Sequence, residues 1–286
     1  RVPADRYGFN VSWDVNRALY HLGLLPYEMF SHPQELLSLL PANAAFDHPK
    51  AHDTVSLKFS DVFMDLGYVN GAEHRTYQAL ELIGERPWIL ERLALISLAK
   101  GETEAGRVLL QSLSRDLVYR KRARASLSRL EADPSLAGDK EVCHLRSIMM
   151  HEDCIGWPSY EEMFIQLLQD NRRNRMAFEY LMAYYLLVGR IDKVAANIVR
   201  LDDFGYSDIP RHYEEAILIY EAATRSRADL HGRSVSPRTL QRFRAFTEVW
   251  ARYRGDRRAA WRALARDHRD SYFFYYQFHQ SMGGRA

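Results

Sequence analysis

The chain has 286 residues and a mass of 33.4 kDa, of which 47% are hydrophobic and 27% are charged, with a net charge of +2. This composition is typical of a folded globular protein and excludes an intrinsically disordered chain. No apolar run reaches the ~18–20 residues that a membrane-spanning helix needs, and two cysteines are too few for a disulfide framework.

Apolar residues recur at helical spacing along the whole chain, and strand-like alternation is rare. Pro and Gly fall mainly between the periodic segments, where they mark turns. We therefore predict an all-α fold with helices, in chain order, at Ser12–Leu22, Pro33–Leu40, Val55–Leu66, Ala72–Ile83, Pro87–Ala99, Glu104–Leu113, Leu117–Leu130, Asp139–Met150, Tyr160–Gln169, Arg175–Val188, Asp192–Leu201, Arg211–Ala223, Pro237–Tyr253, Arg257–Asp267 and Ser271–His279.

These helices are expected to form one continuous domain over residues 1–286, because no break between them is long or polar enough to be a free linker. Within it, residues 1–53 form N-terminal helices, 54–132 regular repeats, 133–157 an irregular junction and 158–286 C-terminal repeats.

The stretches around Gly67 and Gly101 align when one is shifted by 34 residues. In each, a glycine closes one amphipathic helix, and a small residue, Ala72 or Gly106, follows at the start of the next apolar stripe. A fixed period of this length indicates helix-turn-helix units that bury their faces against their neighbours. Glycine can adopt the left-handed conformation at the turn, and small side chains let the two helices approach closely.

These positions resemble the tetratricopeptide repeat. The four units that carry the resemblance are Gly67, Ala72 and Ala79; Gly101, Gly106 and Leu110; Gly189, Ala195 and Ile198; and Gly255, Ala260 and Leu264. The fourth matches weakly, and the interval between the second and third glycines is not a whole number of periods, so the resemblance covers about half of the chain. It implies a right-handed α-α superhelix that binds a protein or peptide on its concave face.

In such repeats the first helix of each pair lines the concave face. Alignment on the turn glycines therefore predicts a groove lined by Asp61, Asp65, Trp88, Glu91, Arg92, Glu179 and Tyr180. Aromatic and arginine side chains usually supply most of the affinity of such grooves, so Trp88, Arg92 and Tyr180 are the expected anchors. The lysine and asparagine clamp that some members of the family use for C-terminal carboxylates is not evident.

A second resemblance rests on the runs DVNRALYHLGLLPYEMFSHPQ and GERPWILERLAL. They are similar to the soluble C-terminal part of an uncharacterised family of bacterial polytopic membrane proteins. This resemblance implies a membrane portion upstream of Arg1, with the present region outside the bilayer, and it supplies no activity. The compartment itself is left open.

Charge is distributed unevenly and leaves a different function open. From Thr224 onward there are 14 Arg and five acidic residues, giving +9, whereas the remainder holds 25 basic and 32 acidic residues, giving −7. This basic region, or the basic segment from Arg120 to Arg129, could bind an anionic partner, either nucleic acid or lipid headgroups. Nucleic acid is the less expected of the two, because the accompanying aromatic residues have the spacing of a core stripe.

No catalytic motif is evident, and we expect a non-enzymatic protein without a cofactor; an α/α-toroid enzyme is the remaining alternative. Metal-ligand residue types crowd together at Cys143, His144, His151, Asp153 and Cys154, but their spacing matches no known zinc motif, so no metal is expected. Whether Cys143 and Cys154 form a disulfide is left open by the sequence.

Overall fold

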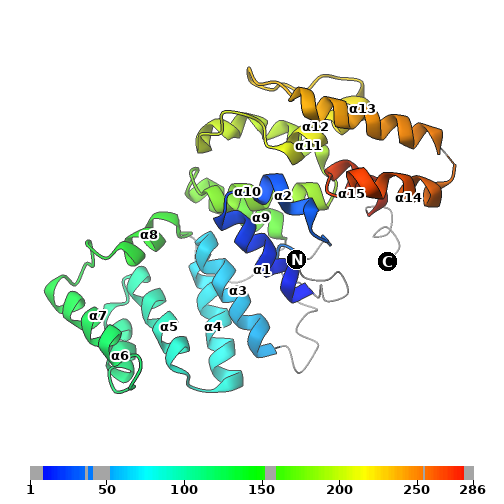
Figure 1. Ribbon diagram of the computed structural model, residues 1–286. Coiled ribbons are helices and arrows are strands. Elements are labelled where there is room, and N and C mark those ends of the chain that lie inside the picture. The colour runs from blue at the N-terminus through cyan, green and yellow to red at the C-terminus, as the bar shows by residue number, and fades with distance from the viewer. Residues whose placement is uncertain (1–8, 36–37, 41–51, 152–158, 254, 280–286) are drawn as a thin grey trace. The chain divides into compact units, whose positions relative to one another are not determined.

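The computed structural model describes residues 9–35, 38–40, 52–151, 159–253 and 255–279, and their regular elements are all helices (Figure 1). The predicted all-α fold is therefore confirmed. None of the described helices is both long enough and apolar enough to cross a lipid bilayer. The contacts divide the chain into two compact units: residues 1–39 with 178–286 form unit 1, and residues 40–177 form unit 2. A single continuous domain remains a prediction.

Unit 2 contains two long helical hairpins followed by three further helices. In chain order these helices are α3 (His52–Leu66), α4 (Val69–Ile83), α5 (Pro87–Lys100), α6 (Thr103–Leu113), α7 (Arg120–Ala132), α8 (Lys140–Ile148) and α9 (Tyr160–Asp170), and the first residues of α10 (Arg175–Leu187) complete the unit. The N-cap of α9 is Ser159, as its sequence indicates, because the side chain accepts a hydrogen bond from the Glu162 amide.

The turns at Gly67 and Gly101 have the same geometry, as the 34-residue period predicts. Their φ angles are +83° and +84°. In each turn the glycine amide bonds to the carbonyl three residues earlier, and the next amide bonds to the carbonyl five residues earlier (Gly67 N to Met64 O, Tyr68 N to Phe63 O). This is the Schellman arrangement that closes a helix with a left-handed residue. The same pair of bonds occurs at Gly189, whereas the turn at Gly255 has a different bond, from Asp256 N to Tyr253 O.

The small residues predicted at helix contacts are mostly buried. Ala72, Ala79 and Ala260 are fully buried. A Cβ atom at Gly106 would lie 2.7 Å from the Leu98 side chain, so its absence lets α6 approach α5. Ala195 is only half-buried, and the neighbouring Val194 takes the buried position in that unit.

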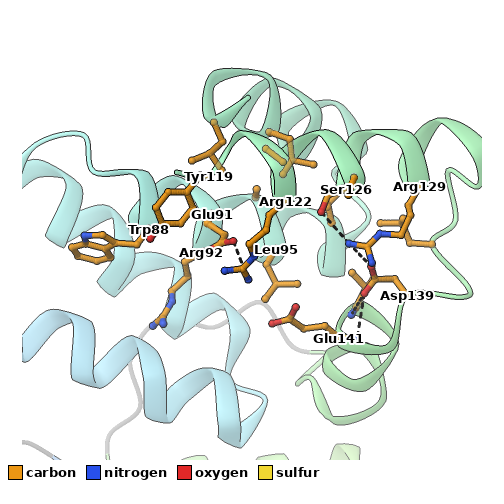
Figure 2. Close-up of a pocket in the computed structure, with 18 residues that line it drawn as sticks. Trp88, Glu91, Arg92, Leu95, Tyr119, Arg122, Ser126, Arg129, Asp139 and Glu141 are labelled. Carbon is orange, nitrogen blue, oxygen red and sulfur yellow. Dashed lines mark hydrogen bonds and ion pairs between the residues drawn. The ribbon is translucent and has the colours of Figure 1, made fainter. Parts of the chain in front are cut away.

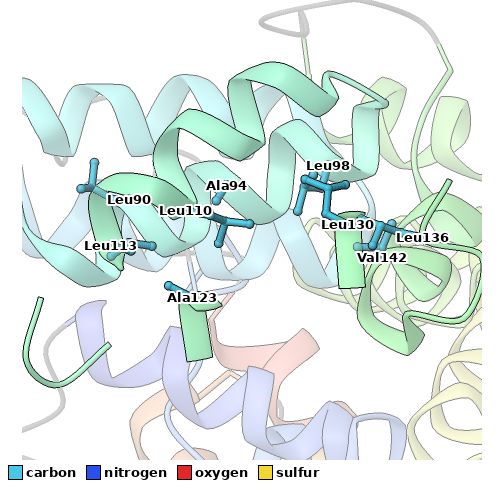
Figure 3. Close-up of a cluster of buried hydrophobic side chains, with 9 residues drawn as sticks. All are labelled: Leu90, Ala94, Leu98, Leu110, Leu113, Ala123, Leu130, Leu136 and Val142. Atoms are coloured by element: carbon cyan, nitrogen blue, oxygen red, sulfur yellow. The ribbon is translucent and has the colours of Figure 1, made fainter. Parts of the chain in front are cut away.

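A cluster of buried aliphatic side chains connects α5, α6, α7 and α8 within unit 2 (Figure 3). Its nine members are Leu90, Ala94, Leu98, Leu110, Leu113, Ala123, Leu130, Leu136 and Val142. The end of α5 is also bound by Arg146 of α8, which donates from Nε to the Ala99 carbonyl at 3.1 Å and from Nη2 to the Leu98 carbonyl at 2.8 Å. The carbonyls of the last turn lack the usual partner four residues later, and the Leu98 carbonyl also accepts from the Gly101 amide. Arg146 therefore fixes α8 against the closed end of α5.

Unit 1 combines N-terminal and C-terminal elements. They are α1 (Phe9–His21), α2 (Leu25–Glu28), the 3₁₀ helix η2 (Met29–Ser31), most of α10, α11 (Ile191–Ala196), the 3₁₀ helix η4 (Ile198–Phe204), α12 (Arg211–Thr224), α13 (Pro237–Arg252), α14 (Arg257–His268) and α15 (Tyr272–Phe278).

Two predicted helices of unit 1 are wrong in detail. Residues 33–35 and 38–40 are not helical. The buried side-chain amide of Asn16 donates from Nδ2 to Gln34 Oε1 and to the Ser38 carbonyl, and these bonds hold the segment in a turn. The helix predicted over Asp192–Leu201 ends at Ala196, where the Asn197 side chain donates to the Lys193 carbonyl and η4 follows. Side chains that bond to nearby backbone in this way compete with helical hydrogen bonds.

A buried histidine and a buried carboxyl group connect three segments of unit 1. His212 and Glu215 lie one turn apart on α12, and both side chains are fully inaccessible. His212 Nδ1 lies 3.0 Å from Glu215 Oε2, while His212 Nε2 accepts from the Phe30 amide at 3.5 Å. Glu215 Oε2 also accepts from the Tyr272 amide at 2.7 Å. Phe30 N therefore requires an unprotonated Nε2, and Nδ1 carries the ring's single proton.

This arrangement predicts that unit 1 loses stability on acidification. Burial lowers the pKa of His212 below its ordinary 6.5; Glu215 and Glu28 oppose that shift, whereas Arg211 adds to it. Below pH 6.5 the unfolded chain therefore binds a proton that the folded chain resists, so stability is complete above pH 6.5 and falls as the pH decreases. We expect the melting temperature to fall between pH 7.5 and 5, and to fall less steeply in His212→Gln.

Burial also lowers the pKa values of His268 and His279, so these residues contribute to the wild-type slope with the same sign. His268→Gln is thus the matched control, since it retains the contribution of His212. Equal slopes for wild type and His212→Gln would contradict the assignment.

Candidate partner-binding pocket

A cavity of about 370 Å³ opens within unit 2 between α5, α6, α7 and α8 (Figure 2). Its lining consists of Trp88, Glu91, Arg92, Ala94, Leu95, Leu98, Leu110, Leu113, Tyr119, Arg122, Ala123, Ala125, Ser126, Arg129, Leu136, Asp139, Glu141 and Val142. The size falls at the low end of the ~300–1,000 Å³ that small-ligand pockets occupy. Such a volume suits one or two side chains rather than a folded domain.

The base of the pocket is apolar. Leu98, Leu110, Leu113, Leu136 and Val142 belong both to the lining and to the buried aliphatic cluster. Because these side chains are packed on their inner sides, the base is held in shape without a ligand. Burying an apolar group against it would remove additional surface from water, which is the main source of affinity in pockets of this kind.

Charged side chains of both signs form the rim. Arg122 Nη2 of α7 lies 3.1 Å from Glu91 Oε1 of α5, and Arg129 Nη2 of α7 lies 3.5 Å from Asp139 Oδ2. The two arginines are seven residues apart, so they lie on the same side of α7. Their side chains are 73% and 60% exposed. Their acidic partners are less exposed, Glu91 at 32% and Asp139 at 14%. Because each pair includes a largely exposed arginine, it contributes little stability, and a ligand cation could replace the arginine at small cost.

The two ends of the pocket differ in chemistry. Figure 2 shows Trp88 and Tyr119 toward one end, and Arg129 with Asp139 toward the other. Trp88 and Tyr119 are both half-buried, so each exposes part of an aromatic ring. Arg129 also donates to Ser126 Oγ at 3.0 Å. The aromatic end can contact an apolar chain from the side, whereas the other end offers hydrogen bonds to a backbone or a polar side chain.

Three of the residues predicted to line a groove line this pocket, namely Trp88, Glu91 and Arg92. Asp61 of α3 forms an ion pair with Arg92, and Arg92 also donates to Ser60 Oγ at 3.2 Å. Asp61 therefore orients Arg92 from outside the lining. Asp65 lies one turn further along α3, is half-buried and does not line the pocket.

The other two predicted residues, Glu179 and Tyr180, belong to unit 1 and are buried. Glu179 is 1% exposed and Tyr180 is 0% exposed. The Tyr206 hydroxyl donates to Glu179 Oε1 at 2.6 Å. Their expected role in a groove is therefore corrected: α10 carries buried residues on every side, so alignment on the turn glycine could not identify an outward face.

The alignment also missed the side of the pocket that α7 and α8 supply. It considered only the first helix of each pair, whereas Arg122, Arg129 and Asp139 come from the helices that follow the second hairpin. The seven-residue spacing of Arg122 and Arg129 was a signal that these two side chains share one side of α7.

The suggested metal-ligand residues do not form a site among the described residues, where no group of three or more His, Cys, Asp or Glu could hold an ion. Cys143 is half-buried, with Sγ 3.2 Å from the Ala137 carbonyl. The His151 amide donates to Asp170 Oδ2. Asp153 and Cys154 lie outside the described residues, so pairing of the two cysteines stays untested.

The fold and the pocket together define an all-helical protein built from glycine-closed helical hairpins, with an open cavity beside the second hairpin. The chain belongs to the family of unknown function DUF6057, which it matches over residues 11–279. No curated protein matches the chain, and no solved structure does.

Proposed function

We propose that this protein is a non-catalytic interaction scaffold and that the α5–α8 pocket binds a segment of a partner protein. The observation that carries the proposal is the combination of a preformed apolar base with a rim of exposed, weakly paired charges. Side chains of an extended or helical segment can enter such a cavity while its backbone contacts the rim. In this proposal the hairpins stack in the manner of a tetratricopeptide superhelix, which the matching turns at Gly67 and Gly101 support.

The pocket specifies the chemistry of the bound segment. An aliphatic or small aromatic side chain fits the apolar base, and the exposed rings of Trp88 and Tyr119 extend that surface. Glu91 and Arg122 can each exchange their mutual ion pair for a group of the segment. We therefore propose a segment with one central apolar residue and polar or charged residues on both sides, with Trp88 and Arg92 as the main anchors.

Filling the pocket should abolish this binding. Ala125 lies on the exposed part of the lining, so Ala125→Trp places an indole across the cavity without removing a core side chain. We expect at least tenfold less co-purification of the partner segment from the source cells. Ser128, one turn further along α7, is also exposed but does not line the pocket, so Ser128→Trp is a matched control that should retain the partner.

Both variants should unfold at the wild-type temperature, since each changes an exposed position of one helix. Full partner recovery by a folded Ala125→Trp protein would refute the pocket as the binding site. Loss of the partner with Ser128→Trp but not with Ala125→Trp would assign binding to the exposed surface of α7 around Ser128.

A second candidate function is binding of an anionic partner by unit 1. Arg258 and Arg262 are exposed on one side of α14, and Arg269 is exposed directly after the helix. Trp261 of α14 is 42% exposed. A steep decrease of affinity with salt, lost when these arginines are neutralised, would favour this function.

A further inference from the structure

The connection between α6 and α7 exposes the two least buried aliphatic side chains among the described residues. Leu117 and Val118 are adjacent, and each is 80% exposed. A single exposed aliphatic residue is ordinary on a protein surface. Two neighbours that are both this exposed in the connection between two helices form a small apolar projection. We define the α6–α7 tip as this pair together with the adjacent Arg115, Asp116, Arg120, Lys121 and Arg124.

The backbone of the tip is fixed on both sides of this pair. Asp116 Oδ1 accepts hydrogen bonds from the Val118 amide at 2.8 Å and from the Tyr119 amide at 2.9 Å. On the preceding side Leu113 is buried in the aliphatic cluster, and on the following side Tyr119 packs against that cluster. The exposure of Leu117 and Val118 is therefore a property of a held turn and not of a frayed end.

Four cations surround the apolar pair. Arg115, Arg120, Lys121 and Arg124 are all exposed, and none of them forms an ion pair with a described residue. The acidic residue of the tip is Asp116, whose carboxylate caps the turn. With four cations and one carboxylate, the tip is strongly positive.

None of these four cations lines the pocket. Arg122 and Arg129 face the rim and pair with Glu91 and Asp139. Arg120 and Arg124 are four residues apart and share the side that carries the exposed Ser128. Hence the tip and the pocket consist of different residues of the same unit.

From this geometry we infer that the α6–α7 tip binds the surface of an anionic lipid bilayer, with Leu117 and Val118 inserted below the headgroups and the four cations among the phosphates. Burial of apolar side chains at the boundary of the acyl chains and attraction of adjacent Lys and Arg to anionic lipids are the two contributions that support such binding. A bilayer accepts a convex projection without a complementary cavity, which a protein partner would have to provide.

Vesicle sedimentation with the full chain tests this inference. We expect binding to vesicles of phosphatidylcholine mixed with phosphatidylglycerol, and no binding to phosphatidylcholine alone. Each cation contributes about a fivefold factor at an anionic surface, so the triple variant Arg120→Gln, Lys121→Gln, Arg124→Gln should bind about 100-fold more weakly. The double variant Leu117→Ser, Val118→Ser should bind vesicles at least fivefold more weakly. High salt screens the attraction of the cations, so the binding that remains there depends mainly on apolar insertion and should also decrease in this variant.

Two matched variants serve as controls. Leu22 is 70% exposed in the connection between α1 and α2, and residues 22–28 include no Lys or Arg, so Leu22→Ser should bind vesicles like the wild type. Arg258→Gln, Arg262→Gln, Arg269→Gln removes the same charge from unit 1. It separates binding by the tip, for which the affinity should change less than threefold, from binding by the second candidate surface. Ala125→Trp, which blocks the pocket, should also bind vesicles normally.

Failure of the wild-type chain to sediment with anionic vesicles in low salt would overturn the inference. Wild-type affinity of the Leu117→Ser, Val118→Ser variant would exclude insertion, and an equal loss with the triple variant of unit 1 would assign the binding to that unit. A preference for an acidic peptide or an oligonucleotide over the vesicles, lost in the same tip variants, would replace lipid by that partner. None of these results bears on the proposed pocket, which is tested separately.

Discussion

Gly67→Ala should destabilise unit 2 by about 3 kcal/mol or more, whereas Gly101→Ala should cost only about 1–2 kcal/mol. Both glycines have positive φ angles near +84°, so alanine is strained at either position to a similar extent. They differ in their surroundings. A Cβ atom at Gly67 would lie 2.1 Å from the Ile148 carbonyl oxygen, whereas nothing lies within 4 Å of one at Gly101.

The contact at Gly67 is with backbone, so it cannot be relieved by rotation of a side chain. The Gly67 carbonyl accepts from the Met150 amide at 2.8 Å, and the neighbouring Leu66 carbonyl accepts from Asn174 Nδ2 at 2.8 Å. The turn between α3 and α4 is thus the surface on which the end of α8 rests. Displacing α8 by the width of a methyl group would break the first of these bonds and disturb the packing around Val142 and Leu145.

Hydrogen exchange of the amides of α3 and α8 measures this difference within unit 2, which a global melting curve of a two-unit protein would not resolve. Protection should fall by two or more powers of ten in Gly67→Ala and by about one in Gly101→Ala. Similar losses in the two variants would show that backbone strain alone accounts for the effect, and that the end of α8 is not held by the turn.

The role of these turns was largely readable from the sequence. A glycine between two amphipathic stripes predicts a left-handed C-cap, and the 34-residue offset predicts that two such turns are equivalent; both turns have the Schellman bonds. The helices of the hairpins were predicted within a few residues for the same reason, since local periodicity determines them. What periodicity could not show is that Gly67, unlike Gly101, lies against a helix about 80 residues further along the chain.

The candidate site was predicted only in part, for a related reason. Trp88, Glu91 and Arg92 follow from the alignment of one hairpin with another. The opposite rim depends on how α7 and α8 pack against that hairpin, and no turn glycine of the repeat pattern lies between these two helices to fix their register. The predicted exposure of Glu179 and Tyr180 was wrong, because a helix that is apolar on all sides gives no signal for which side faces outward.

Non-local polar contacts are the second feature that the sequence could not provide. His212 and Glu215 have the spacing of neighbours on a helix, but nothing in that spacing indicates that the Phe30 and Tyr272 amides complete their hydrogen bonds. These contacts connect residues that are 182 and 57 positions apart. They explain why the N-terminal segment and the C-terminal helix belong to one compact unit.

Glu215→Ala should therefore destabilise unit 1 by about 3–4 kcal/mol, and Glu215→Gln by less than about 1 kcal/mol. Alanine leaves two buried donors, the Tyr272 amide and His212 Nδ1–H, without an acceptor, at about 1–3 kcal/mol each, and it also opens a cavity. Both donors use the same oxygen, Oε2. A glutamine carbonyl in that place keeps both bonds, while its amino group takes the position of Oε1, which has no hydrogen-bond partner among the described residues.

Urea denaturation followed by hydrogen exchange at α12 and α15 distinguishes the variants. A large loss with alanine and near-wild-type protection with glutamine would show that the carboxyl group acts as a shared acceptor. Equal losses would contradict this role, because the buried charge itself would then be required. Glu214→Gln on the adjacent position is the control. Glu214 Oε1 accepts from the Ser236 amide, and Oε2 accepts from the Ser236 and Thr239 hydroxyls. A glutamine there must turn its amino group toward the two hydroxyls and reverse their hydrogen bonds, which should cost about 1–3 kcal/mol.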